Sequence, residues 1–241
     1  MPASTDASLV WPSGVLSPPA ATGFPAGYRV GVTRYADVIL RDALPQRYAD
    51  LIAVLDSYRV HADELVVGGG NRSSQTARFD AGLHQRGWGK RTVTVEKRID
   101  GRLIHQTRGH EIDMFGPGED EYPGVAVEVE WNNKDPFFDR DLLNFQALHR
   151  EGALAVGVIF TRGPQLQQVI GLTIRGDRSL KFGRSTTHWD KLEPRINLGG
   201  GGECPLIAIG IEPDRVDGFA PILQAFESGE CITPSAWVRS T

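Results

Sequence analysis

Two glutamates stand two positions apart in an otherwise apolar run of the chain. In VAVEVEW, residues 125–131, Glu128 and Glu130 alternate with apolar residues, so on an extended strand both carboxylates point to one face. Like charges held so close raise each other's proton affinity and repel, unless a cation or a shared proton compensates. The pattern therefore indicates either a solvent-facing edge strand, where a polar face is ordinary, or a site that uses both acids.

A third acid, Asp113, lies in the apolar stretch HEIDMF and could end an adjacent strand. Three carboxylates would then converge. Such an oxygen-rich cluster suits Mg²⁺, which takes one or two carboxylates and completes its shell with water and substrate phosphate. Mn²⁺ is an alternative ion for the same ligands, and the predicted chemistry is phosphoryl transfer to water. A retaining glycosidase fits less well, because neighbours on one strand face are poorly placed to flank a sugar.

Longer phrases around these acids resemble a known family. Asp113 followed by Glu128-Val129-Glu130 is similar to the PD-(D/E)xK nuclease signature, in the variant with glutamate in place of the usual lysine. Over about residues 45–212 the chain resembles the BamHI/BglII-type branch of type II restriction endonucleases. The phrases that carry the resemblance are HEIDMF, EVEWNNKDPFFDRDLLNF, GVIFTRG and STTHWDKLEPRINLGGGGECPLIAIGI.

The resemblance implies a sequence-specific endonuclease that hydrolyses phosphodiester bonds of double-stranded DNA with Mg²⁺. By resemblance, Asp113 and Glu128 would hold the metal together with the carbonyl of Val129. Glu130 would position or deprotonate the attacking water. Two departures from the common pattern leave the general base open: glutamate rather than lysine at 130, and Pro117 after rather than before the aspartate.

The resemblance also leaves one residue and the kind of activity open. Glu96 is a further acidic candidate, since some relatives carry another acid near the metal, but it could equally be an exposed hairpin glutamate that partners Lys97 or Arg98. A catalytically inactive DNA-binding or regulatory protein of the same fold is one alternative function, although such a protein has little reason to keep costly acids. A modification-dependent or repair nuclease is another.

Basic residues are concentrated on both sides of the acidic centre, although a net charge of −4 argues weakly against nucleic acid. Residues 84–109 hold seven basic residues against two acidic ones, and residues 162–195 hold seven against three. Solvated faces are the alternative. Amides beside the acids and a helix N-terminus near 184–188 suit bases or phosphates, unless they form a simple turn and a simple cap. The candidate DNA-contacting residues are Arg72, Asn132, Asn133, Lys134, Arg140, Arg184, Ser185, Thr186, Thr187 and His188.

Periodicity and turn residues predict an α/β fold of the restriction-endonuclease type, with a mixed central β-sheet sandwiched by helices. Residues 1–27, rich in Pro, Ala and Ser, are expected to form a flexible N-terminal arm, and residues 28–241 a single nuclease domain. Apolar spacing predicts helices at 45–59 and 141–152, the second capped by Asp139 or Asp141. Strands on both sides of 141–152 indicate a crossover connection.

The remaining elements follow from caps, glycines and apolar runs. A helix is expected within 68–88, capped near Ser73 or Ser74, and another within 185–203, kinked or divided by Pro194. Residues 92–108 predict a hairpin that turns at Asp100-Gly101. The segment GPGEDEYPG is expected to be a loop. Strands are predicted at 124–131, 154–163 and 204–212.

A symmetric double-strand cut with one metal centre per chain favours a homodimer related by the DNA dyad, with the helices at 45–59 and 141–151 as candidate interface. No apolar run approaches the ~18 residues that span a bilayer, and the N-terminus lacks the pattern of a signal peptide. The expected partners are therefore double-stranded DNA and a second copy, without a membrane, in the cytoplasm.

Overall fold

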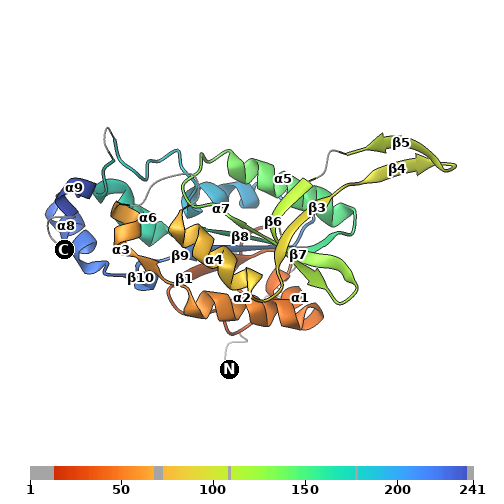
Figure 1. Cartoon of the computed structure of the whole chain (residues 1–241), viewed down its shortest axis with the longest axis horizontal. Coiled ribbons are helices and arrows are strands. Elements are labelled where there is room, and N and C mark those ends of the chain that lie inside the picture. Colours follow the sequence, from red (N-terminus) through yellow and green to blue (C-terminus); the bar gives the residue numbers. More distant parts are fainter. Residues whose placement is uncertain (1–13, 68–72, 108–109, 177–178, 238–241) are drawn as a thin grey trace, which may run out of the picture.

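A six-stranded mixed sheet organises the chain, with helices on both faces (Figure 1). The computed structural model describes residues 14–67, 73–107, 110–176 and 179–237. The strand order is β1-β9-β8-β7-β6-β3; β7, β8 and β9 run parallel and the other neighbours antiparallel. The strands are β1 (Tyr28–Val32), β3 (Gly89–Val93), β6 (His110–Gly118), β7 (Glu121–Val129), β8 (Leu154–Arg162) and β9 (Leu206–Ile211). The predicted fold class is confirmed.

Strand β7 lies inside the sheet, between β6 and β8. Its alternation is the one that the sequence predicts: Val125 and Val127 are buried in the core on one side, and Ala126 is buried on the other. Helix α5 (Phe137–Arg150) leads from β7 to the parallel strand β8, which confirms the crossover. Because β7 has a strand on each side, the edge-strand alternative for its two glutamates is wrong.

The helices divide between the two faces of the sheet. The larger core takes apolar side chains from α1, α2, α3, α4 and α6, and the smaller core takes them from α5 and α7. Helix α8 packs against α6. The remaining bounds are α1 (Ala36–Ala43), α2 (Pro45–Ser57), α3 (Ala62–Val66), α4 (Ser74–His84), α6 (Pro164–Thr173), α7 (Trp189–Asn197), α8 (Ala220–Ser228), α9 (Pro234–Trp237), the 3-10 turn Pro213–Arg215, and the small pair β2 (Val60–His61) and β10 (Val216–Asp217).

Helix boundaries follow the sequence signals in most places. Helix α4 begins after Ser73, whose hydroxyl accepts a hydrogen bond from the Thr76 amide, as predicted for a cap. Helix α7 runs through Pro194 as one helix and ends three residues later, so the expected division is wrong. Helix α5 starts at Phe137, and neither Asp139 nor Asp141 caps it. Its N-cap is Pro136, which places the two aspartates inside the helix.

Two segments between strands differ from the expectation. The hairpin at Asp100-Gly101 is confirmed, because both turn residues have positive φ, 47° and 79°, as a tight type I′ turn needs. Its strands, β4 (Glu96–Ile99) and β5 (Arg102–Gln106), form a separate two-stranded sheet that projects from the body (Figure 1). GPGEDEYPG is not a plain loop, because β6 and β7 extend into it and pair Gly118 with Glu121.

The described part of the expected N-terminal arm contacts the domain. Ser17 and Val32 exchange two backbone hydrogen bonds of 2.8 Å. The amide of Ala21, a buried residue, donates to Asp37. Residues 1–13 of the expected arm lie outside the described residues. The described residues of this segment therefore contact β1 and α1 instead of extending away from the domain.

Candidate active site

Asp113 and Glu128 are cross-strand neighbours. Strands β6 and β7 pair antiparallel, and the register of Met114 with Val127 sets Asp113 opposite Glu128. The backbone amide of Asp113 donates to Glu128 Oε1 at 3.4 Å. Glu128 is 8% exposed, whereas the side chain of Asp113 is 62% exposed. The sheet therefore brings together one buried and one open carboxylate, as expected from the sequence.

Burial governs the protonation of Glu128. Burial is the main cause that raises the pKa of its carboxyl, and repulsion from Asp141 and Asp113 adds to it; the pKa reaches about 9. The amide of Asp113 and the guanidinium of Arg140 act in the opposite direction but do not offset burial. Without an added cation, this carboxyl is protonated at neutral pH.

Glu130 lies just beyond β7, in a position fixed by strand β8. Its amide donates to the carbonyl of Phe160 at 2.9 Å, and its carbonyl accepts from Thr161 Oγ1 at 2.7 Å. Its carboxylate is 3% exposed, accepts from Asn133 Nδ2 at 2.8 Å and lies 3.5 Å from Arg140. Burial, followed by Asp141, raises the pKa of Glu130 to about 8.

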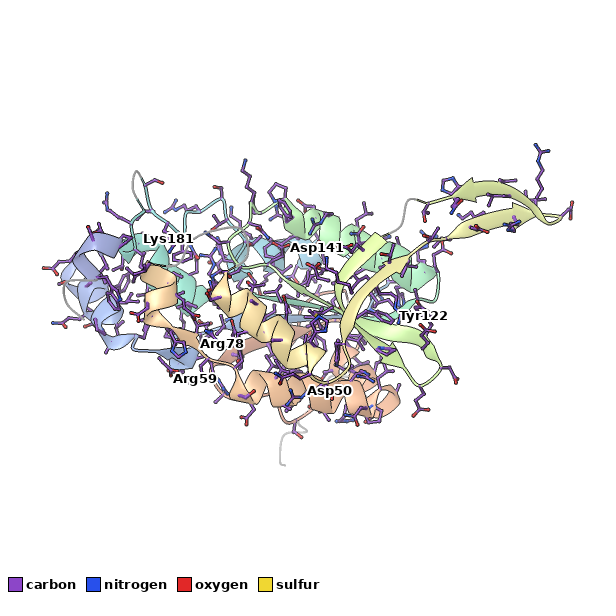
Figure 2. The ribbon with its side chains drawn as sticks, in the orientation of Figure 1. Asp50, Arg59, Arg78, Tyr122, Asp141 and Lys181 are labelled. Atoms are coloured by element: carbon purple, nitrogen blue, oxygen red, sulfur yellow. The ribbon has the colours of Figure 1, made fainter. Side chains whose placement is uncertain are left out.

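Asp141 is a buried acid that the sequence analysis treated only as a helix cap. It lies on α5 at the centre of the molecule (Figure 2), with its side chain 2% exposed. Its Oδ1 accepts two hydrogen bonds from Arg140, and its carboxyl lies against that of Glu130. Burial raises the pKa of Asp141. Its other oxygen, Oδ2, has no hydrogen-bond partner in the described part of the chain.

A sequence signal for Asp141 existed. On α5 it stands three residues after Phe138 and four before Phe145, both buried, so it occupies a core position of an amphipathic helix. An acid at such a position needs a partner. A helix cap faces solvent and needs no such partner, so the prediction of a cap did not indicate a buried acid.

A cleft of about 440 Å³ opens beside the exposed acid. One wall is a face of α4, held over the sheet by Phe79, whose ring stacks on Phe160 of β8 at 4.4 Å. The other wall is formed by the adjoining ends of β3, β6 and β7. The lining residues are Ser73, Thr76, Asp80, His84, Lys90, Asp113, Met114, Val129, Trp131, Asn132 and Asn133. Lys90 on β3 lies 3.7 Å from Asp113 and 2.6 Å from Glu111.

The chemical type of the ligands that these acids offer suits a hard cation. All side-chain donors are carboxylate oxygens, the buried ones repel each other, and Asp141 has an unpartnered oxygen. Over the residues that the structure describes, no three His, Cys, Asp or Glu side chains form a ready-made metal group. Two carboxylates and a backbone carbonyl, completed by water and phosphate, are nevertheless a usual Mg²⁺ shell.

Two segments predicted to contact DNA pair with each other. The amide of Asn133 donates to Thr187 Oγ1 at 3.2 Å, and the amide of Thr187 donates to the Asn133 carbonyl at 2.9 Å. The backbones of Lys134 and Thr186 form an isolated antiparallel β-bridge. The side-chain amide of Asn133 is engaged by Glu130 rather than free for a base. Asn132 and Asn133 line the cleft, and Lys134 is exposed.

Arg162, which is fully buried, holds the second of these segments, residues 184–188, in place. Its guanidinium donates to Thr186 Oγ1 at 2.7 Å and to the Thr187 carbonyl at 2.6 Å. Thr187 and His188 are buried, whereas Arg184 and Ser185 are exposed. Only the exposed pair is open to a backbone or groove in this arrangement.

Three candidate residues remain, and they differ in where they lie. Glu96 is on the projecting hairpin, where its carboxylate pairs with Arg98 at 2.8 Å; the structure does not bring it to Asp113. Arg140 is half-exposed and lies beside Glu130. Arg72 lies outside the described residues.

Comparison with protein-family models identifies a family for the chain. The family model described as "Restriction endonuclease BglII/BglIII" matches residues 28–211, which include all six strands of the sheet and both glutamates of β7 and its end. No curated protein matches the chain. No helix in the described part of the chain is long and apolar enough to cross a membrane.

Proposed function

Because the chain belongs to the BglII/BglIII restriction endonuclease family, we propose that it is a sequence-specific type II endonuclease that hydrolyses double-stranded DNA with Mg²⁺. The observation that carries the proposal is the register of β6 and β7. It sets Asp113 opposite Glu128, with Glu130 on the same face as Glu128, and of these three acids Asp113 lines the cleft. That is the constellation a metal-dependent phosphodiesterase needs, on the strands where the family resemblance expects it.

Asp113, Glu128 and the carbonyl of Val129 would hold the ion. When bound, Mg²⁺ supplies positive charge that stabilises the phosphate oxygens during displacement, and Mn²⁺ can take its place. The chain has reason to take up such an ion, because the cation relieves the repulsion among Glu128, Asp113 and Asp141. Lys90 partly neutralises Asp113 from β3.

Glu130 acts on the attacking water. Burial raises the pKa of its carboxyl to about 8, close to the pH at which a general base works best. The amide of Asn133 and the guanidinium of Arg140 hold the carboxylate in one orientation. Arg162, through Thr187, holds Asn133 in turn. Positioning of this kind is what the family variant requires, since a carboxylate here replaces the commoner lysine.

Asp141 is a positioning residue in this scheme. It fixes Arg140 by two hydrogen bonds and raises the pKa of both Glu128 and Glu130 through its charge. Its side chain is 2% exposed and is engaged by Arg140 and Glu130, so it acts through these neighbours. Removing its charge should therefore change the rate of cleavage more than the affinity for DNA.

A homodimer would place two such sites across the dyad of a symmetric duplex. Of the two helices considered for its interface, α5 presents Leu143, 65% exposed, next to Leu198, 89% exposed; both line a shallow hollow of about 350 Å³. The apolar residues of α2 are largely buried in the core. We therefore assign the interface to α5. We also propose that residues 28–241 form a single nuclease domain that acts in the cytoplasm.

The test is direct. The purified full chain is incubated with phage DNA in Mg²⁺ or in EDTA, and discrete bands in Mg²⁺ alone are expected. A gel shift without cleavage in any divalent ion would indicate an inactive DNA-binding protein of the same fold. Cleavage confined to methylated DNA would indicate a modification-dependent nuclease instead.

A further inference from the structure

The β4–β5 hairpin stands apart from the fold. Every residue from Glu96 to Gln106 is exposed, and the two strands pair only with each other. The ribbon continues the line of β3 and β6 and leaves the body beside the start of β6 (Figure 1), the strand that carries Asp113. The amide of Thr107 donates to the carbonyl of Val95 at 2.9 Å, so the ladder is continued at its base. Such a ribbon contributes little to the core.

The register separates the charges of the hairpin onto two faces. Lys97 pairs with His105, and Ile99 pairs with Arg102. Cross-strand partners share a face, and so do residues two apart on the regular strand. One face, here called the basic face, therefore carries Lys97, Ile99, Arg102 and His105, and none of these is acidic.

The opposite face is neutralised within itself. Arg98 pairs with Glu96 at 2.8 Å and donates to the carbonyl of Gly101 at 3.1 Å. Its cross-strand partner is Leu103. Arg98 therefore has its partners on the hairpin, whereas Lys97 and Arg102 point their charge away from this ion pair. Only one face of the ribbon is suited to a polyanion.

The reach of the hairpin fits DNA that is bound at Asp113. His105 and Arg102 precede Asp113 by 8 and 11 residues, which at about 3.3 Å per residue is at most roughly 26 and 36 Å along the strand. One turn of B-DNA is about 34–36 Å long. The basic face therefore lies within about one helical turn of a phosphate held at Asp113.

We propose that the β4–β5 hairpin is a DNA-binding arm, and that Lys97, Arg102 and His105 on its basic face contact backbone phosphates flanking the cleaved site. The proposal rests on the proposed function, since it needs a duplex bound at the acids. Phosphate contacts are independent of sequence, so the arm adds affinity and salt dependence but no base readout.

The experiment measures binding of the full chain to a fluorescein-labelled random duplex of about 40 base pairs in Ca²⁺, across a salt series. Each lost phosphate contact should reduce the slope of log affinity against log salt by about 0.9. For Lys97→Ala/Arg102→Ala the loss of affinity between about 50 and 200 mM salt should be about tenfold smaller than for the wild type. Arg98→Ala is the control matched to the single variant Lys97→Ala, because each removes one positive charge, from opposite faces. It should keep the wild-type slope and wild-type cleavage.

Each other outcome decides against the arm in a distinct way. Equal slopes for the wild type and the double variant overturn the proposal while leaving the nuclease intact, as cleavage of phage DNA would show. An equal effect of Lys97→Ala and Arg98→Ala overturns the assignment of one face. If Ile99→Ser/Ile104→Ser turns a dimer into a monomer with an unchanged salt slope, the hairpin contacts a second copy instead. A wild type that neither binds nor cleaves duplex overturns the proposed function as well.

Discussion

The side-chain amide of Asn133 donates a hydrogen bond of 2.8 Å to Glu130. The backbone amide and carbonyl of Asn133 are both hydrogen-bonded to Thr187. Thr187 is held in turn by the buried guanidinium of Arg162. A chain of hydrogen bonds thus runs from the interior of β8 to the carboxylate at the end of β7. The asparagine predicted to read DNA is built into the support of an acid.

Asn133→Ala should slow cleavage by about ten- to a hundredfold and leave duplex affinity close to that of the wild type. A hydrogen bond to a charged group is worth about 1.5–3 kcal/mol, and its loss lets the Glu130 carboxylate rotate. Single-turnover cleavage and gel shifts in Ca²⁺ check both expectations. Affinity that falls in step with the rate would show that Asn133 contacts DNA directly.

Asp113→Ala and Glu128→Ala should each abolish cleavage while the fold remains. Mg²⁺ should raise the melting temperature of the wild type, because a ligand that binds only the native state stabilises it. Neither variant should show this rise. Glu111→Ala is the control, since Glu111 lies two residues from Asp113 on β6 and shares its contact with Lys90. Wild-type rates in either acid variant would remove both residues from the site.

Glu130→Gln should separate binding from chemistry. The variant keeps Asp113 and Glu128 for one ion but lacks the group that orients or deprotonates water, a role worth roughly 10²–10⁴ in rate. It also removes a negative charge that repels the DNA backbone. We expect binding equal to or tighter than that of the wild type, with cleavage at least about a hundredfold slower.

Glu130→Lys should be inactive, although lysine is the commoner residue in the wider superfamily. Its ammonium would lie beside Arg140, where the site is built for a carboxylate. Single-turnover cleavage measures the rate of both variants, and gel shifts in Ca²⁺ measure their affinity. If Glu130→Gln lost binding together with cleavage, Glu130 would position DNA rather than water.

Asp141→Asn should stabilise the metal-free protein and slow cleavage. It removes one of three buried carboxyls, which raises the pKa of the other two, and we expect this loss to add about 1 kcal/mol of stability and about 2–4 °C of melting temperature. It also loosens Arg140 and lowers the pKa of Glu130, so cleavage should fall by about tenfold or more. Asp139→Asn on the same helix is the control, because Asp139 is exposed and pairs with Arg195. A melting temperature that falls would mean that Asp141 serves the fold alone.

Glu212→Gln tests a half-buried acid that does not line the cleft. Its carboxylate accepts from the amide of Leu166 at the start of α6, and burial raises its pKa from 4.5 to about 7. An acid with a raised folded-state pKa contributes stability that is complete below pH 4.5 and is lost as the pH rises to about 7.

Glutamine does not titrate and keeps an oxygen for Leu166. Over this pH window the wild type should therefore lose about 1–2 kcal/mol relative to the variant, less than a fully buried group would because solvent screens it. Urea unfolding of both proteins at pH 4.5 and 8 checks the sign. A difference that does not depend on pH would refute it.

The sequence predicted the sheet and the acid pair because both depend on local patterns. Alternation in β7 puts Glu128 on one face whatever surrounds it, and Asp100-Gly101 sets a turn by its own backbone preference. The cap of α4 at Ser73 is equally local. These signals act within a few residues, so a single chain displays them.

The support of the site could not be predicted in the same way. Arg162 meets Thr187 across 25 positions, and Asn133 meets it across 54, so neither spacing carries a signal. Asp141 was interpreted as a cap because aspartate favours that position, whereas packing of α5 turned it inward. The contribution of each residue to the site depends on the fold having formed first.

The β4–β5 arm has a consequence for dynamics. An isolated two-stranded ribbon is marginally stable in water, and at the base of this one Val95 and Thr107 are joined by two hydrogen bonds. Its amide hydrogens should exchange with solvent through local opening within the native state, while those of β7 and β8 exchange only when the whole domain unfolds. If DNA binds to the basic face, the ribbon must become ordered as the complex forms. The duplex would then slow exchange in the arm far more than in the core, and the arm would fold with every encounter and unfold with every release.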